Sequence, residues 1–494
     1  MSYLKSVGTS IIYIGAFLAV ITFVPGIPPN SKFTEYSVIA PKKLTDALAI
    51  NGRLNNAEIL FQGHLKGPEA FASYNGELYT GIHGGFIVKV TDNKIIPIVK
   101  FGKDCDGLWQ ESKCGRPLGL KFDDKGVLYA CDAYYGIFKV DVKTGKYKEI
   151  INVAEPIEGK RPMIVNSLDI ANNGDIYWTD SNVEFHLEDG IYTGLVNPSG
   201  RVFRYDAKTK KNQVLVDNLA FANGIALSKD EDFIIVAETF ASRIIKYNLK
   251  GPNAGKWEIF AEGLPGMINS DNNSGFLVSL VIYADEEHPQ LLQSVMPHPY
   301  IRRMSARLLT LLEAPFKCLQ IYYPNYYTEK IIHYLGGFEN ILFLNTNIVT
   351  ILRIDNKGKI VDAAYNTDGR ISGISTAYIH NEFLWLGTPF SEYISRVPLK
   401  QAFPNLLIEE KQQFEKVKQT EKKINANINN QQKPSSATPT PNPTESKSFT
   451  TPSPKPVKSK PSSSTKKPQE SKSSNKPSKI SNQQKSSRSS ETNS

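Results

Sequence analysis

Residues 116–140, RPLGLKFDDKGVLYACDAYYGIFKV, contain three short β-prone segments separated by turns. The first is Arg116-Pro117-Leu118-Gly119-Leu120, and the second, Leu128-Tyr129-Ala130, follows a turn that ends in glycine. The third, Ile137-Phe138-Lys139-Val140, alternates apolar and charged side chains. Short strands with Gly and Asp at the turns are typical of all-β folds. This phrase is therefore a candidate repeating unit.

The same phrase recurs along the chain. Its first segments are Gly67–Phe71, Arg116–Leu120, Val165–Asp169, Ala222–Ala226, a degenerate copy near Gly266–Ile268, and Gly373–Ala377. Its alternating third segments are Ile87–Val90, Ile137–Val140, Val202–Tyr205, Ile244–Tyr247, Ile351–Ile354 and Ile394–Val397. Fourth segments such as Gln213–Val216 complete the units. Repeats of roughly fifty residues with four strands each predict a β-propeller, and six copies predict six blades.

Blades five and six depart from the simple repeat. The sixth copy has no fourth segment before the chain turns polar, and we expect Ala57–Phe61 to supply it and close the ring. Blade five carries an insertion over about residues 284–346, in which Arg302, Arg303 and Arg307 lie between apolar residues at helical spacing. We expect an amphipathic helical cap over one face of the propeller. A substrate lid and a membrane-contacting surface are the alternatives.

The N-terminus carries an apolar run from Val7 to Val24, with Lys5 before it. This length is near the lower limit for a membrane span, and a preceding positive charge favours a cytoplasmic N-terminus. A cleaved signal peptide is the rival interpretation. We expect an uncleaved signal anchor within residues 1–30. The chain would then be a single-pass type II protein of the plasma membrane or an endomembrane, with a lumenal or extracellular propeller over residues 31–400.

The C-terminal segment differs in composition from the rest. Residues 424–494 are dominated by Ser, Thr, Pro, Lys, Asn and Gln, and we expect them to be disordered, after a linker over 401–423. They contain twelve Lys or Arg and three acidic residues, which accounts for the whole formal charge of +9. The basic charge is thus a property of the tail and does not indicate a nucleic-acid-binding fold. The composition resembles an O-glycosylated, mucin-like stalk.

The cysteines and sequons fit an oxidising compartment. Cys105 and Cys114 flank a short loop and could form a disulfide, whereas we expect Cys131 to be a buried thiol. Asn272 lies in the one N-glycosylation sequon in which proline does not follow the asparagine.

Polar residues recur at matching positions of three innermost segments. These are Glu69, Asn166 and Asn223. Carboxylate and amide oxygens are the ligands that Ca²⁺ prefers. The alternative is that the two asparagines occupy turns or satisfy buried backbone groups.

Several motifs give the chain a specific family resemblance. They are Cys114–Gly119 with Cys105, Asp132–Gly136, Glu155–Lys160, Phe221–Gly224 and Val236–Thr239. With the tail, they resemble adipocyte plasma membrane-associated proteins and hemomucins over roughly residues 1–400. The resemblance implies a strictosidine-synthase-like propeller, a type II anchor, and an esterase- or lactonase-like, arylesterase-type activity with a divalent ion in the channel. By motif, the family's metal ligands fall on Glu69, Asn166 and Asn223.

The sequence also departs from the family pattern in blade five. The family places an Asp-Asn pair shortly after a Pro-Gly, but Pro265-Gly266 runs directly into Met267, and Asp271-Asn272 falls in a loop beyond the strand. The stretch Asn325–Thr346 is a further insertion. In blade six, Arg370–Ile379 contains no acidic residue, whereas strictosidine synthases use a glutamate there, so alkaloid-forming condensation is not expected.

Two functions remain open. The first is a calcium-dependent hydrolase of small esters or lactones, for which His83 is the candidate general base because it follows an early strand. The second is a non-catalytic, mucin-like surface glycoprotein that binds a ligand or another cell. The missing blade-five carboxylate favours the second function, and the family resemblance favours the first.

Overall fold

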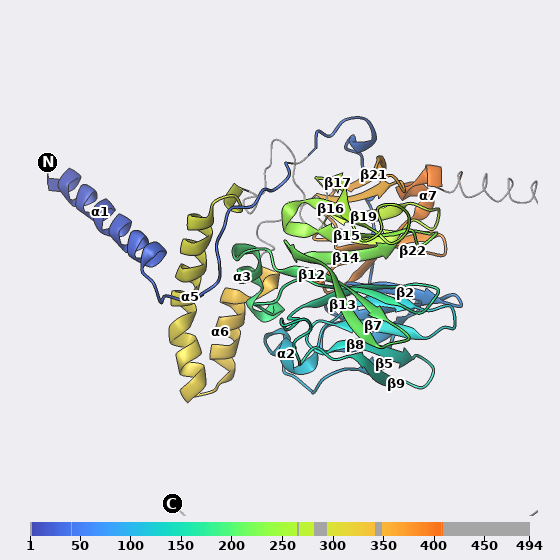
Figure 1. Ribbon diagram of the computed structural model, residues 1–494, viewed down its shortest axis with the longest axis horizontal. Coiled ribbons are helices and arrows are strands. Elements are labelled where there is room, and N and C mark those ends of the chain that lie inside the picture. The colour runs from blue at the N-terminus through green and yellow to red at the C-terminus, as the bar shows by residue number, and fades with distance from the viewer. Residues whose placement is uncertain are drawn as a thin grey trace, which may run out of the picture. The chain divides into compact units, whose positions relative to one another are not determined.

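The protein is a six-bladed β-propeller, shown edge-on in Figure 1. This computed structural model describes residues 2–40, 42–263, 266–280, 294–340, 348–406 and 408. The expected tail, from residue 424 onward, lies outside the described residues. Each blade is a four-stranded antiparallel sheet in which sequence neighbours pair, except where the ring closes.

Blades one to three follow the predicted repeat. Blade one contains β2 (Phe71–Tyr74), β3 (Glu77–Ile82), β4 (Phe86–Val90) and β5 (Ile95–Lys100). Blade two contains β6 (Pro117–Phe122), β7 (Leu128–Asp132), β8 (Gly136–Asp141) and β9 (Lys146–Ile151). Blade three contains β10 (Val165–Ile170), β11 (Ile176–Asp180), β12 (Gly200–Asp206) and β13 (Lys211–Leu219).

Blades four to six complete the ring. Blade four contains β14 (Ala222–Leu227), β15 (Phe233–Glu238), β16 (Arg243–Asn248) and β17 (Trp257–Glu262). Blade five contains β18 (Gly266–Ser270), β19 (Phe276–Leu280), β20 (Val349–Ile354) and β21 (Ile360–Asn366). Blade six contains β22 (Thr376–His380), β23 (Phe383–Gly387), β24 (Ile394–Pro398) and β1 (Glu58–Leu60).

The ring closes as the sequence predicted. Strand β1, which precedes blade one, pairs antiparallel with β24, with Glu58 opposite Arg396 and Leu60 opposite Ile394. Strand β1 thus covers the outer edge of β24 and gives blade six its fourth strand. Packing also continues past residue 400, where the linker was expected to begin. The helix α7 (Leu399–Ala402) is followed by Phe403 and Leu406, and both of these side chains are fully buried.

The core lies between the blades rather than in one centre. Each of six hydrophobic clusters combines side chains from two neighbouring blades; Ile87 of blade one, for example, packs with Leu128 and Phe138 of blade two. The last cluster joins Phe71 of blade one to Trp385 of blade six. Successive side chains of a strand point to opposite faces of its sheet, and each blade buries apolar side chains on both faces. A core therefore forms between each pair of neighbouring blades.

Turn chemistry fixes the register of the blades. In blade one, the loop between β2 and β3 is Asn75-Gly76, with φ of 50° and 78°. Two consecutive left-handed residues define the hairpin turn that Asn-Gly favours.

The blade-five insertion forms two helices, α5 (Pro299–Tyr322) and α6 (Tyr326–Gly336). They lie beside one face of the propeller, as Figure 1 shows. Short helical segments on the same side receive them: η2 (Leu108–Gln110), η3 (Leu187–Asp189) and α3 (Gly190–Leu195). Two further short turns of helix, η1 (Asp46–Leu48) and η4 (Thr239–Ala241), and the short helix α2 (Glu111–Cys114) lie elsewhere in the chain.

The N-terminal helix α1 (Ser2–Phe23) contains the predicted apolar run. Its 22 residues span about 33 Å, close to the thickness of a bilayer's hydrocarbon core. Its C-terminal end packs against α5, where Arg307 Nη1 donates hydrogen bonds to the carbonyl oxygens of Ile21, Thr22 and Val24. By length and composition α1 can cross a membrane, a test that a signal sequence also passes.

Candidate functional site

The inner strands of all six blades line a central cavity of about 150 Å³. Lys121, Asp169, Leu227 and Ser270, at or next to the ends of β6, β10, β14 and β18, line a second cavity together. These strands therefore end on one face, and they begin on the other. Glu69, Asn166 and Asn223 belong to the face where the strands begin, which is the end of the channel on which we place the candidate metal centre.

A local irregularity positions the two asparagines. The pairing register of β10 shifts between Val165 and Leu168, and that of β14 shifts between Ala222 and Ile225. Each asparagine lies within such a bulge, which re-aims a side chain relative to a regular strand. The side-chain amides then make equivalent bonds. Asn166 Nδ2 donates to Ser181 Oγ over 3.1 Å, and Asn223 Nδ2 donates to Thr239 Oγ1 over 3.1 Å.

The acceptor atoms of both side chains remain unused. Asn166 Oδ1 and Asn223 Oδ1 are buried, and neither has a hydrogen-bond partner among the described residues. An unpaired buried oxygen costs about 1–3 kcal/mol unless water or an ion satisfies it. The repetition of this arrangement in two neighbouring blades fits a pair of cation ligands. It does not fit the alternative in which both side chains serve the backbone.

Hydrogen bonds between blades hold the two asparagines in fixed relation. Ser181 Oγ accepts from Asn166 and donates to the Ala222 carbonyl over 2.7 Å. Thr179 Oγ1 donates to the carbonyl of Asn223 itself over 2.7 Å. The end of β11 thus bonds both to the Asn166 side chain and to the strand that carries Asn223.

Glu69 lies just before β2 and is almost fully buried, with 5% of its surface exposed. Burial raises the pKa of its carboxyl to about 7, although the Arg116 guanidinium opposes this shift. Arg116 Nη2 lies 4.0 Å from Glu69 Oε2, beyond hydrogen-bond distance. A divalent cation would stabilise the charged carboxylate here. The oxygen atoms of these three side chains are of the type that a hard cation such as Ca²⁺ prefers, and Glu69 would be the single negative ligand among them.

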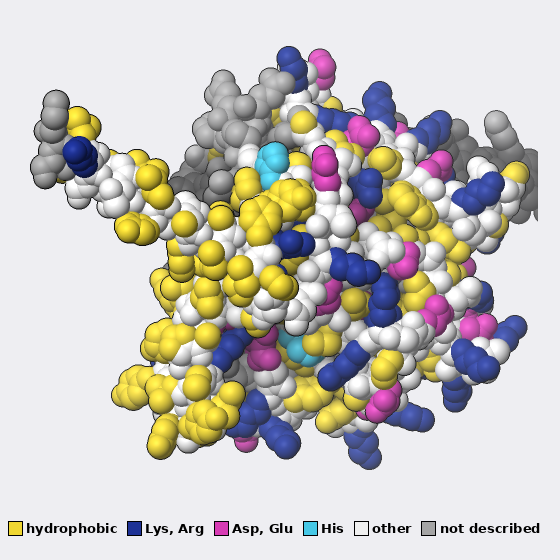
Figure 2. All heavy atoms as spheres, turned by 60° about the vertical axis from the view of Figure 1, so that its left-hand side comes forward, with side chains coloured by type: hydrophobic (Ala, Val, Ile, Leu, Met, Phe, Trp, Pro, Cys, Tyr) yellow, Lys and Arg dark blue, Asp and Glu magenta, His cyan; other side chains and the backbone are white. Residues whose placement is uncertain are grey.

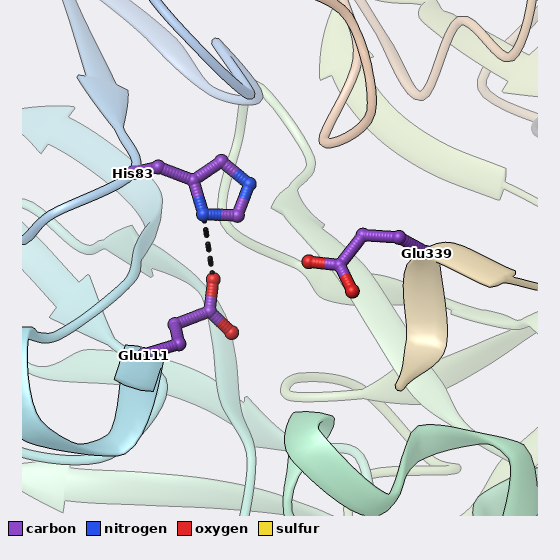
Figure 3. A group of neighbouring side chains, drawn as sticks. All are labelled: His83, Glu111 and Glu339. Carbon is purple, nitrogen blue, oxygen red and sulfur yellow. Dashed lines mark ion pairs between the residues drawn. The ribbon is translucent and has the colours of Figure 1, made fainter. Parts of the chain in front are cut away.

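A second polar cluster lies beside Glu69. His83, Glu111 and Glu339 present ligand atoms that are all within 4.8 Å of one another (Figure 3). His83 Nδ1 lies 2.9 Å from Glu111 Oε1. Arg116 Nη1 also donates to Glu111 Oε1, over 2.7 Å. Because a guanidinium already neutralises this carboxylate, we assign no metal to this cluster.

Both ring nitrogens of His83 already face partners. Nε2 lies 3.3 Å from the Pro389 carbonyl, and Nδ1 lies 2.6 Å from Arg116 Nη1. Burial and the neighbouring Arg116 charge lower the pKa of His83, so the ring is neutral near pH 7. Burial alone would raise the pKa of Glu111, but Arg116, His83 and Tyr134 together hold it below its ordinary value. A neutral imidazole can act as a base only if one nitrogen becomes free.

Other buried acids near this face have structural partners. Asp180 and Glu238, at the ends of β11 and β15, pair with Arg201 and Arg243 and accept backbone N–H groups. Asp132, at the end of β7, accepts the N–H groups of Tyr134 and Tyr135 through Oδ1. Asp132 Oδ2 is buried and has no hydrogen-bond partner among the described residues. The paired oxygens of these three carboxylates fix the loops of this face.

The blade-five acid lies away from this site. Asp271 is in the turn after β18, where it pairs with Arg353 over 2.8 Å and accepts N–H groups of Asn273 and Gly275. It does not place a carboxylate at the start of the strand. Asn272, the sequon residue, is exposed in the same turn.

The insertion from blade five reaches over the site. Phe338 stacks on Phe221 at 5.4 Å and on Phe390 at 5.9 Å, which brings blades four and six under one side chain. Helix α6 also contacts the linker between blades one and two through Gln110, which donates to Glu329. In that linker, Cys105 and Cys114 form a disulfide.

Sequence reasoning missed Glu111, Arg116 and Glu339 as members of this cluster. Arg116 belongs to the motif Cys114–Gly119. Its position directly before an inner strand could have placed it near Glu69, which also precedes an inner strand. Glu339 carried no such signal, because the insertion has no counterpart in the repeat.

Comparisons with known proteins agree with the architecture. Family profiles described as "Strictosidine synthase" and "Strictosidine synthase-like, N-terminal" match residues 166–252 and 46–90. The chain is 41% identical over 395 residues to the adipocyte plasma membrane-associated protein Hemomucin of Drosophila melanogaster, covering 78% of this chain and 68% of that one. It is 30% identical to the adipocyte plasma membrane-associated protein of Rattus norvegicus, covering 74% and 92%.

Among solved structures, a gluconolactonase from Xanthomonas campestris aligns with a TM-score of 0.44 and 14% identity, covering 75% of this chain and 99% of that one. A luciferin-regenerating enzyme aligns with a TM-score of 0.42 and 11% identity, covering 69% and 95%. These scores are too low to support an inference about activity. The identities to hemomucin and its relatives, with the six-bladed ring, show that the chain belongs to the adipocyte plasma membrane-associated protein and hemomucin family of strictosidine-synthase-like propellers.

Proposed function

We propose that this protein is a membrane-anchored hydrolase of small carboxylic esters or lactones that holds Ca²⁺ at the face where the inner strands begin. The observation that carries the proposal is the pair of buried, unpartnered amide oxygens on Asn166 and Asn223. With Glu69 they form an all-oxygen donor set. Bound Ca²⁺ would supply a Lewis acid that polarises a substrate carbonyl.

Three residues of the protein, Glu69, Arg116 and His83, would set the charge and the geometry of the site. Glu69 would bind the cation as a carboxylate, and the Arg116 charge would favour this ionised form by opposing the rise in its pKa that burial causes. His83 stays the candidate base, but its bonded nitrogens favour a positioning role in which it helps Glu111 to hold Arg116 in place.

One observation favours the alternative of a surface-binding glycoprotein without turnover. Asp271 is committed to Arg353, so a single assigned negative ligand faces a divalent ion. Such a site would bind Ca²⁺ weakly, with a Kd of about 10⁻⁵–10⁻³ M. The mucin-like tail and a glycan on Asn272 would suit that role.

Calorimetry with Ca²⁺ on the full chain in detergent, paired with an arylester and lactone hydrolysis assay, separates the two functions. The hydrolase proposal expects calcium binding and calcium-dependent hydrolysis, both abolished in Glu69→Gln and in Asn223→Leu. The exposed control Glu155→Gln should keep both. Binding without hydrolysis would favour the ligand-binding function, and absence of binding would remove the metal assignment.

For the topology, we propose a type II anchor formed by α1, with the propeller on the lumenal or extracellular side. The names of the relatives describe plasma membrane-associated proteins. The disulfide between Cys105 and Cys114 suits that compartment.

A further inference from the structure

The outward surface of the α5–α6 hairpin is apolar along its whole length. Over residues 300–334, every exposed residue is aliphatic, proline, tyrosine or cysteine. The Lys317 side chain is 42% exposed, but it is paired with Asp189 and Glu313. The most exposed large apolar side chains are Tyr300 and Leu312 at 60%, Tyr322 and Tyr323 at 72%, Ile321 at 74%, and Tyr327 and Tyr334 at 75%. Figure 2 shows yellow side chains gathered over the helices at its left. We call this set the outer face of α5–α6.

Three charged residues of α5, Arg302, Arg307 and Glu313, are buried. Arg302 donates to the carbonyls of Leu195 and Val196 at the end of α3. Glu313 accepts from Tyr192 over 2.7 Å and pairs with Lys317 over 2.9 Å. A helix on the surface of a water-soluble protein has the reverse arrangement, with its charges outside. The outer face is therefore built for contact with an apolar phase.

The position of α1 identifies that phase. Arg307 of α5 caps the C-terminal carbonyls of α1, and Phe23 of α1 packs on Tyr300 of α5 with ring centroids 5.5 Å apart. If α1 crosses a bilayer, the chain leaves that bilayer at α5. The outer face then begins at the membrane boundary, and six of its exposed side chains are tyrosines, which favour that boundary because they pair an apolar ring with a polar hydroxyl.

We propose that the outer face of α5–α6 lies in the interfacial region of the same bilayer that holds α1. The propeller then rests on the membrane by the face that carries Glu69, Asn166 and Asn223, instead of standing away from it on a flexible stem. This proposal rests on the membrane anchor given under the proposed function, but it does not depend on calcium or hydrolysis.

The chain carries its own reporter for this surface. Cys318 is an exposed free thiol of α5, one helical turn from Ala314 and Tyr322, whereas Cys131 is buried and Cys105 and Cys114 are joined. A fluorophore attached to Cys318 in the full chain, reconstituted in phosphatidylcholine vesicles, can be quenched by brominated lipid from the membrane or by iodide from water.

Two matched variants with one introduced cysteine each complete the test, both in a Cys318→Ser background. Lys125→Cys places the label in the exposed turn between β6 and β7, on the opposite face of the propeller. Ser10→Cys places it within α1 and reports the anchor alone. We expect strong quenching by brominated lipid at Cys318 and Ser10→Cys, with iodide quenching at least several-fold weaker than at Lys125→Cys.

Quenching at Ser10→Cys without lipid quenching at Cys318 would overturn the proposal while leaving the anchor intact. A Cys318 label protected from both quenchers would overturn it in favour of a second copy or another protein. Lack of lipid quenching at Ser10→Cys would refute the anchor itself. The variant Tyr322→Gln/Tyr323→Gln/Tyr327→Gln should reduce lipid quenching at Cys318 without changing it at Ser10→Cys.

Discussion

Replacing Glu69 by glutamine should stabilise the metal-free protein and abolish its response to calcium. The carboxyl is buried, and burial raises its pKa from 4.5 to about 7. Keeping this group ionised above pH 7 therefore costs the folded state about 3 kcal/mol relative to the unfolded chain. Glutamine has nearly the same shape and carries no charge, so the cost disappears. Arg116 keeps Glu111 as its partner in the variant.

The pH dependence has a defined sign. In the folded protein Glu69 holds its proton to a higher pH than in the unfolded chain, so the cost is absent below about pH 4.5 and grows as the pH rises to about 7. In EDTA, Glu69→Gln should match the natural protein near pH 4.5 and exceed its free energy of unfolding by up to about 3 kcal/mol near pH 8.

Calcium should reduce this difference in stability. A cation bound to the ionised Glu69 stabilises only the folded natural protein, and with a Kd of about 10⁻³ M the gain at about 10 mM Ca²⁺ is about 1.4 kcal/mol. Urea titrations followed by tryptophan fluorescence, at several pH values with EDTA or Ca²⁺, measure both effects. Glu155→Gln, an exposed carboxylate, is the control. A Glu69→Gln protein that is less stable than the natural one near pH 8 in EDTA would refute the reasoning.

Three further predictions concern other parts of the chain. Cys105→Ser/Cys114→Ser should lower the free energy of unfolding by about 3 kcal/mol, because the disulfide closes a loop of about ten residues in the unfolded chain; non-reducing peptide mapping should find the linked pair, and two free thiols would contradict this. Truncation after Asn430 should leave the melting temperature of the propeller unchanged, since residues 431–494 have too few apolar side chains to form a core, and a fall of several degrees would show that the tail packs. Carbonate extraction followed by N-terminal sequencing should find the protein in the membrane fraction with α1 intact, whereas a soluble product beginning near residue 26 would indicate cleavage.

The blade repeat could be predicted from the sequence because each unit is local. The Asn75-Gly76 turn, the alternation in Ile137–Val140 and the apolar segment at Ala57–Phe61 each fix a structure within a few residues. The closure of β1 on β24 follows, because blade six had no other strand available. The matching positions of Asn166 and Asn223 were visible for the same reason.

The cluster beside Glu69 could not be predicted in this way. His83, Glu111 and Glu339 come from a loop, a linker and an insertion, and only the closed ring brings them together. The orientation of α5 was also inaccessible. The sequence of α5 has arginines between apolar residues, so either its charged side or its apolar side could face the propeller. Arg302 and Glu313 are buried, which shows that the charged side faces the propeller. The pattern of apolar and polar residues identifies the buried face of a helix only when its other face is exposed to water.

The closing strand also determines how the ring would respond to mechanical load. Residues 54–60, on the side of α1, and residues 394–406, on the side of the tail, share one buried cluster, in which Leu54 and Ala57 pack with Phe403 and Leu406. Because β1 and β24 are antiparallel, with Glu58 opposite Arg396, the N-terminal end of β1 lies beside the C-terminal end of β24. Tension between the anchor and the tail would therefore peel this pair open one bond at a time instead of shearing it. Leu54, Phe403 and Leu406 would bear the force first, and their loss would open the ring at blade six.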